Sequence, residues 1–149
     1  MQTSRDEQVE PPTSGHEAQL GRYPRAMKKK YWRVYSDQQG ESHVEERDID
    51  LQLMNYAPPA PPVFVSSPTV AAGFVYLCAP KGIEGDLHPT PRRQLQVLLS
   101  GSVELEASDG TVITAKPGDV FLLEDTQGRG HKSRIGADQA AEILAVTMP

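Results

Sequence analysis

The sequence predicts an all-β protein, an antiparallel β-barrel behind a disordered N-terminal tail. The chain is rich in turn formers, with 13 prolines and 12 glycines among 149 residues, and these residues interrupt helices and separate strands. From residue 69 onward, short runs of β-forming residues recur at even spacing, which is typical of a sandwich or a barrel. Asp109-Gly110 stands between two of these runs, and this dipeptide is a strong hairpin signal.

Composition divides the chain into three parts. Residues 1–28 are polar and lack apolar periodicity, so they cannot bury enough surface to offset their ordering entropy, and we expect a disordered tail. Residues 29–68 are expected to hold two N-terminal strands and a Pro-rich connection packed on the barrel. Residues 69–149 are expected to form the barrel itself. Its predicted strands are 70–78, 95–99, 102–107, 111–114, 120–123, 131–135 and 142–147.

Charge and hydropathy exclude several classes of partner. The net charge of -5 argues against nucleic acid, whose phosphates require a clustered basic face. No apolar stretch approaches membrane-spanning length, so we expect no membrane partner and a cytoplasmic location. The lone Cys78 cannot form an internal disulfide. It lies in an apolar run, where a buried thiol is expected.

The segment from Gly82 to Gly101 has a regular spacing of polar residues. Gly82 is followed by five residues and His88, then by one residue and Thr90, by three residues and Gln94, and by six residues and Gly101. This spacing resembles the first motif of the cupin family. The second histidine of that motif is replaced by Thr90 and its glutamate by Gln94.

A second segment resembles the other cupin motif. Pro117-Gly118-Asp119 opens a strand, and Gly128 precedes His131 by the two intervening residues of that motif. The usual proline is replaced by Glu124 and the usual asparagine by Ile135. The resemblance covers residues 70–146 and implies a cupin-type double-stranded jelly roll. It implies no particular reaction, because this fold hosts many functions.

A polar stripe is the best site candidate in the chain. His88, Thr90 and Gln94 share parity, so an uninterrupted strand would point all three to one face, and Gln96 extends the stripe. Such a stripe inside a small barrel is costly unless a ligand, a metal or water satisfies it. The cupin resemblance implies that His131 faces it.

Metal binding is one of two interpretations of this stripe. In cupins that resemble this chain, three histidines and one glutamate hold a divalent ion. Here His88 and His131 remain, and Gln94 can offer a carbonyl oxygen, but the loss of an imidazole and the carboxylate weakens the site. The metal ligands would be His88, Gln94 and His131, holding zinc, iron or nickel. In the other interpretation there is no cofactor, and the two histidines are hydrogen-bonded or act as acid and base.

Further side chains are candidates for substrate contacts. Arg92 has the parity of the site face and could bind an anionic oxygen through two hydrogen bonds, or it could lie at the rim and pair with a carboxylate. Substrate contacts are expected from Thr90 and Gln96. Tyr76 could line the pocket or pack in the core, and Glu124 could reach the pocket mouth or face solvent.

These residues predict an enzyme that acts on a small, oxygenated, anionic organic molecule. His88 and His131 suit proton transfer next to a carbonyl, with Arg92 or Gln94 stabilising an oxyanion. The reaction would be that of an isomerase, cyclase, dehydratase or decarboxylase, by analogy in secondary metabolism. One alternative is a non-catalytic, ligand-binding cupin with a lost metal site. Another is an iron-dependent cupin dioxygenase.

A homodimer is also expected from the sequence. Small barrels of this type leave an edge strand and an apolar outer face, here Leu95, Val97 and Leu99. A second subunit could cover this face, with residues 31–34 added to a neighbouring sheet.

Overall fold

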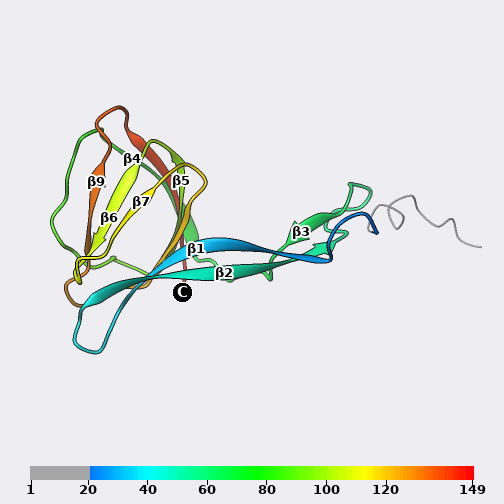
Figure 1. Ribbon diagram of the computed structural model, residues 1–149, viewed down its shortest axis with the longest axis horizontal. Helices are drawn as coiled ribbons and strands as arrows, with labels where there is room; N and C mark the ends of the chain where they lie inside the picture. Colours follow the sequence, from blue (N-terminus) through cyan, green and yellow to red (C-terminus); the bar gives the residue numbers. More distant parts are fainter. Residues whose placement is uncertain (1–20) are drawn as a thin grey trace, which may run out of the picture. The chain divides into compact units, whose positions relative to one another are not determined.

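The computed structural model describes residues 21–149, which form ten β-strands and no helix (Figure 1). No helix among these residues could therefore cross a membrane. Residues 1–20 of the predicted tail lie outside the described residues, and β1 already begins within the rest of that tail. The strands are β1 Ala26–Ser36, β2 Ser42–Met54, β3 Val63–Val65, β4 Gly73–Ala79, β5 Gln94–Ser100, β6 Val103–Ala107, β7 Val112–Ala115, β8 Val120–Leu123, β9 His131–Ile135 and β10 Ala141–Thr147.

The chain divides into two compact units. Among the described residues, the smaller unit holds 21–27 and 50–67. In it, β3 pairs antiparallel with the end of β2, with Gln52 opposite Val65. In the Pro-rich segment, residues 57–61 are exposed and make a turn in which the Ala60 N–H donates to the Ala57 carbonyl at 2.9 Å. The larger unit holds residues 28–49 and 68–149. It therefore includes much of β1 and β2 in addition to the segment that was predicted to form the barrel.

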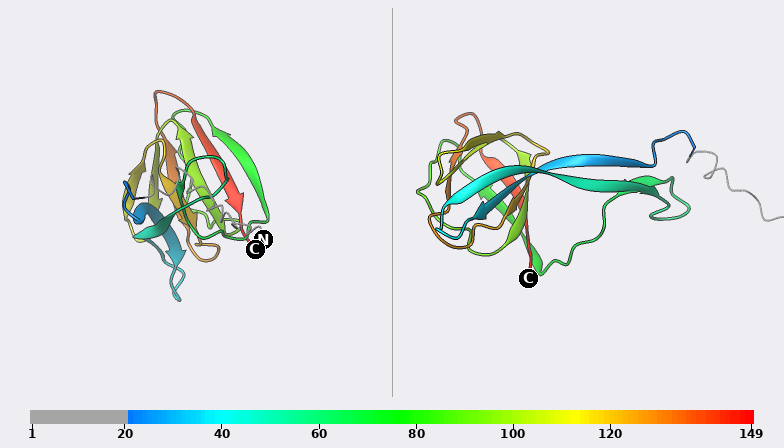
Figure 2. Two further views of the ribbon diagram at one scale, coloured as in Figure 1. Left: turned by 90° about the vertical axis from the view of Figure 1, so that its right-hand side faces the viewer. Right: turned by 60° about the horizontal axis from the view of Figure 1, so that its bottom comes forward.

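The larger unit is built from two sheets (Figure 2). One has the strand order β2-β1-β8-β5-β10-β4 and the other the order β7-β6-β9. Two isolated antiparallel bridges, Glu84 with Arg134 and His88 with His131, place residues 84–88 beside β9 as a fourth member of the smaller sheet. Together with β4, β10, β5 and β8, this makes the double-stranded jelly roll of a cupin-type fold. The predicted fold class is confirmed, and each predicted barrel strand overlaps one of the strands β4 to β10.

Alternation of apolar and polar residues explains why these strands form and where the core lies. In β6, Val103, Leu105 and Ala107 are buried between the sheets, while Glu104 and Glu106 are only partly covered. The hairpin predicted at Asp109-Gly110 joins β6 to β7, and Gly110 has a φ of +89° that suits glycine. The central cluster comprises Val34, Leu98, Val103, Leu105, Ala115, Phe121, Leu123, Ile135 and Ala141.

The two edges of the larger sheet differ. At one end β2 is the edge strand, and β1 lies between β2 and β8, with Trp32 opposite Phe121, so residues 31–34 belong to the sheet of their own chain. At the other end, β4 pairs with β10 alone. Cys78 lies on β4 and is exposed. The expectation of a buried thiol was wrong, because no strand of residues 21–149 lies beyond β4.

Candidate functional site

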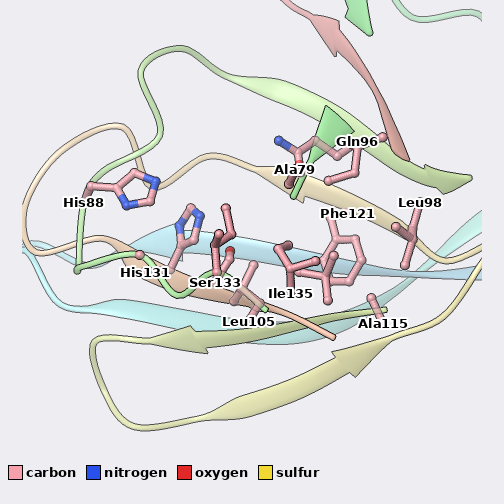
Figure 3. Close-up of a pocket in the computed structure, with 14 residues that line it drawn as sticks. Ala79, His88, Gln96, Leu98, Leu105, Ala115, Phe121, His131, Ser133 and Ile135 are labelled. Atoms are coloured by element: carbon pink, nitrogen blue, oxygen red, sulfur yellow. The ribbon is translucent and has the colours of Figure 1, made fainter. Parts of the chain in front are cut away.

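The barrel contains a cavity of about 270 Å³ between its two sheets. The side chains of its wall are apolar except for four, which are His88, Gln96, His131 and Ser133. The rings of His88 and His131 lie next to each other at one end, with Leu98 and Ala115 at the other (Figure 3). His88 is exposed while His131 is buried. His88 therefore lies where the cavity meets solvent and His131 lies further inside.

Backbone pairing brings the two histidines together. The His88 N–H donates to the His131 carbonyl at 2.9 Å, and the His131 N–H donates back at 3.0 Å. Their ring centroids are 5.1 Å apart. Gly130 allows this approach, because its φ is +74° and a Cβ there would lie 2.0 Å from the His88 carbonyl oxygen. The structure thus brings together the two histidines that the cupin motifs singled out.

A buried carboxylate orients His131. The His131 Nδ1 lies 2.7 Å from Oδ2 of Asp125, two residues beyond the end of β8. The Thr90 hydroxyl donates to the other oxygen, Oδ1, at 2.7 Å, and the Ser42 hydroxyl donates to Oδ2 at 3.2 Å. All four side chains are buried, and Asp125 has no exposed surface. Both hydroxyls, both oxygens of Asp125 and the Nδ1 of His131 have partners, as buried polar groups require.

These contacts fix the tautomers of both rings. Both oxygens of Asp125 accept hydroxyl hydrogen bonds, so His131 Nδ1 is the donor in its contact with Asp125. His88 Nδ1 lies 2.8 Å from the Asp86 carbonyl oxygen, which can only accept, so this Nδ1 is also a donor. In each neutral ring the free lone pair is consequently on Nε2. The cavity wall thus offers two basic nitrogens.

Two members of the predicted polar stripe lie outside the cavity wall. Thr90 is buried against Asp125, with its hydroxyl and its N–H both donated to that residue. Gln94 begins β5, pairs with Leu123 and is absent from the wall, whereas Gln96 lines the cavity. The premise of an uninterrupted strand from His88 was wrong, because β5 begins only at Gln94.

Glu124 bridges two arginines and does not line the cavity. Its carboxylate accepts from Arg33 Nε at 2.7 Å and from Arg93 Nε at 2.8 Å. Burial alone would raise the pKa of Glu124, but these hydrogen bonds and charges outweigh it, and the pKa is lowered. Glu124 therefore ties β1 and the start of β5 to β8, which is a structural role.

Arg92 and Tyr76 also lie outside the cavity wall. Arg92 is exposed in the loop before β5. The neighbouring Arg93 pairs with the carboxylate of Glu124, which is the contact expected of an arginine at the barrel rim. Tyr76 is exposed on β4, because this strand has no neighbour on its outer side. Of the predicted catalytic and substrate-binding residues, His88, His131 and Gln96 line the cavity.

The donor set of the cavity is small for a divalent ion. His88 and His131 provide two Nε2 atoms, but Asp125 contacts the opposite nitrogen of His131, and Gln94 is absent from the wall. In the part of the chain that the structure describes, no three His, Cys, Asp or Glu side chains gather as a metal site would require. Catalytic zinc sites use three protein ligands. The two imidazoles are one ligand short of such a set, and of the other wall side chains only Gln96 and Ser133 could add an oxygen.

Sequence reasoning missed Asp125, Ser42 and Ser133. Glu124 and Asp125 are adjacent, so they face opposite sides of the chain. The cupin motif drew attention to Glu124, whereas Asp125 is the residue that faces inward. One sequence signal was available. If Glu124 pairs with arginines at the surface, its neighbour Asp125 must face the interior of the barrel.

Comparisons with known proteins give similarities to solved structures alone. No family model matches the chain, and no curated protein matches it. It is similar to a cupin 2 conserved barrel domain protein from Salinispora arenicola, with 22% identity, 66% of this chain and 76% of that chain covered, and a TM-score of 0.42. It is also similar to an RmlC-like cupin from Shewanella frigidimarina, with 13% identity, coverage of 78% and 83%, and a TM-score of 0.39. A third is the Cnp3 cupin domain of Schizosaccharomyces pombe, with 17% identity, coverage of 87% and 88%, and a TM-score of 0.36. No activity of this chain follows from these similarities.

Proposed function

We propose that the chain is an enzyme that transfers a proton next to a carbonyl group of a small neutral molecule bound in the cavity. The observation that carries the proposal is the buried hydrogen bond of 2.7 Å between His131 Nδ1 and Asp125. This hydrogen bond keeps the proton of the neutral ring on Nδ1, so the lone pair of His131 Nε2 is free to act in the largely apolar cavity that His131 lines. The reaction class is isomerisation, cyclisation or dehydration.

His131 is the general base in this proposal. Its Nε2 removes a proton from the carbon next to the carbonyl, and Asp125 stabilises the imidazolium that forms. The electron pair of the broken C–H bond moves onto the carbonyl oxygen. Gln96 and Ser133 line the same cavity and supply N–H and O–H donors for this developing oxyanion. The His131 imidazolium then returns the proton from Nε2 to the carbon of the rearranged product, or His88, at the mouth, supplies one after its Nε2 has taken up a proton from solvent.

The cavity wall favours a neutral substrate over the anionic one expected from the sequence. Arg92, which supported the anionic expectation, lies outside the wall, and no Lys, Arg, Asp or Glu side chain is part of it. An unpaired anion would be costly to bury among apolar side chains. At about 270 Å³, the cavity suits a ligand smaller than a typical drug.

The proposal is tested by deuterium exchange at carbon. Acetophenone, cyclohexanone and other small ketones in D2O are followed by proton NMR with and without protein. Wild-type protein should accelerate exchange next to the carbonyl for at least one ketone. His131→Gln should reduce the rate to that of buffer, and Asp125→Asn should lower it by about 100-fold or more. His43→Gln, which changes a histidine outside the cavity wall, is the matched control and should keep the wild-type rate.

Two results would contradict the proposal. Ketones that bind in saturation-transfer NMR without any exchange would indicate the alternative of a non-catalytic, ligand-binding cupin. Near-stoichiometric iron in purified protein that disappears from the His88→Ala, His131→Ala double variant would favour the iron-dependent dioxygenase instead.

A further inference from the structure

The open edge of the larger sheet is the least protected part of the barrel. At the other end of this sheet the edge strand β2 carries charged side chains such as Glu45, Glu46 and Arg47, whereas β4 has only β10 as a neighbour and carries no charged side chain. The left view of Figure 2 shows β4, in green, outside β10, in red. Natural proteins usually blunt such an edge with charges, proline or a covering segment, because its unpaired N–H and C=O groups can bind another strand.

The side chains of β4 are apolar and exposed on both faces. Phe74 is 74% exposed and Tyr76 is 57% exposed, and they share one face of the strand. Val75, 47% exposed, and Leu77, 39% exposed, share the other face. In an ordinary edge strand, the side chains of one face are buried against the core. In β4 the side chains of both faces are exposed, so a partner at this edge would find apolar side chains on either face.

Charge also distinguishes this segment. The chain carries a net charge of -5, yet residues 51–80 contain no Asp, Glu, Lys, Arg or His. Elsewhere the surface carries charged side chains of both signs, which two copies would have to pair or desolvate on meeting. At β4 they can approach without doing so, and every antiparallel register of Gly73–Ala79 with itself places uncharged side chains opposite each other.

We propose that β4 pairs antiparallel with β4 of a second copy, so that the larger sheets of two barrels become continuous. A two-fold axis makes such an interface self-complementary, since each strand provides the same donors and acceptors. Unlike the dimer expected from the sequence, this one uses neither residues 31–34 nor the outer face of β5.

The exposed area is adequate for the centre of such an interface. Phe74, Val75, Tyr76, Leu77 and the preceding Val70, which is 74% exposed, together offer on the order of 500 Å² of apolar surface. A standard stable interface buries about 800 Å² per partner. Flanking residues and the backbone of β4 would supply the remainder.

The edge strand of the smaller sheet provides a matched control. Val112 on β7 is 47% exposed, the same fraction as Val75 on β4. β7 is also an edge strand, but it has four residues and stands between Asp109 and Lys116. A lysine substitution at Val75 or at Val112 therefore changes the same residue type at the same exposure, on different edges.

Multi-angle light scattering after size exclusion, at micromolar protein, tests the proposal. Wild-type protein should have twice the chain mass of 16.3 kDa. Val75→Lys and Tyr76→Lys act on opposite faces of β4, and each should raise the dimer dissociation constant by ~100-fold through juxtaposed like charges. Val112→Lys should remain a dimer.

Three outcomes would overturn the proposal. The first is a monomeric wild type, which would leave the edge free or reserve it for a different protein. The second is a dimer that persists in both β4 variants when circular dichroism shows them to be folded. If the variants do not fold, wild-type hydrogen exchange decides. If the wild type is a β4-paired dimer, the protection of the β4 amides from hydrogen exchange should fall when the protein is diluted. Protection that does not depend on protein concentration would be the third outcome that overturns the proposal.

Discussion

Two histidines of the barrel contact aspartates at nearly the same distance but in opposite surroundings. His43 lies 2.8 Å from both Asp37 and Asp109, and its side chain is 32% exposed. His131 lies 2.7 Å from Asp125, and its side chain is 6% exposed. The two networks start on adjacent residues of β2, because the hydroxyl of Ser42 contacts Asp125 and the next residue is His43. The comparison shows that burial, more than the contact itself, determines what such a pair contributes.

Water accounts for the difference. Around His43 it competes for each hydrogen bond and screens each charge, so the contacts contribute little on balance. Around His131 each polar group depends on the others, since an unpaired buried group bears the full cost of its desolvation. We therefore expect large effects in the buried network and small, pH-dependent effects in the exposed one.

The largest effect is expected for Asp125→Ala. The change leaves Thr90, Ser42 and His131 Nδ1 without their common acceptor, and all three side chains are buried. The free energy of unfolding should fall by about 3–5 kcal/mol, measured by urea denaturation. Asp109→Ala removes an acceptor from the exposed histidine and should cost much less. Equal losses in the two variants would remove the distinction between the networks.

A smaller effect separates the two hydroxyls that contact Asp125. Thr90→Val removes a charge-assisted hydrogen bond of 2.7 Å without changing the side-chain shape, and should cost about 1.5–3 kcal/mol. Ser42→Ala removes the longer contact of 3.2 Å and should cost about 1 kcal/mol. Urea denaturation of both variants at one pH makes the comparison. A larger loss for Ser42→Ala would mean that the two distances do not rank the donors.

Most of the fold could be predicted because its signals are local. The alternation in β6 and the turn at Asp109-Gly110 depend on residues next to each other in sequence. Strand neighbours are not local, so the parallel pairing of β1 with β8 and the open edge at β4 could not be read from the sequence. For the same reason the exposure of Cys78 was not predicted.

The candidate site was predictable only in part. The resemblance to the two cupin motifs identified His88 and His131, and the antiparallel bridge between them places the two side by side. Alternation showed that Glu124 and Asp125 face opposite sides, but it could not show which side is buried. Parity was counted through residues 89–93, which form a loop, and so did not locate Thr90. Gln94 has the same parity as Gln96 but is the first residue of β5 and is not part of the cavity wall.

A pH-dependent effect is expected for His43→Gln. Hydrogen bonds to Asp37 and then Asp109 raise the pKa of His43 above its ordinary value of 6.5. The imidazolium is thus favoured in the folded state, and its stabilising contribution is complete below pH 6.5 and lost as the pH rises through the raised pKa. Urea denaturation between about pH 5 and pH 9 should show the largest difference between wild type and variant at the acid end.

The two partner carboxylates do not obscure this measurement. The pKa of Asp37 is lowered, first by the hydrogen bond to His43. Burial alone would raise the pKa of Asp109, but hydrogen bonds from Thr111 and His43 outweigh it, and this pKa is lowered too. The contribution of each carboxylate is therefore lost only as the pH falls below 3.8. A difference between wild type and His43→Gln that is constant with pH would contradict the role of charge. It would instead indicate that packing of His43 against Tyr35, at 5.6 Å between ring centroids, accounts for the effect.

The smallest effect is expected for Glu41→Gln, in the loop that leads into β2. Glu41 pairs with Arg129 at 3.0 Å, and the arginine side chain is 60% exposed. An exposed pair of this kind contributes at most about 0.5 kcal/mol, and added salt should remove the contribution. Urea denaturation at low and high salt measures both. A loss as large as that of Ser42→Ala would mean that the loop network around His43 is cooperative despite its exposure, and burial alone would then no longer separate the two histidines.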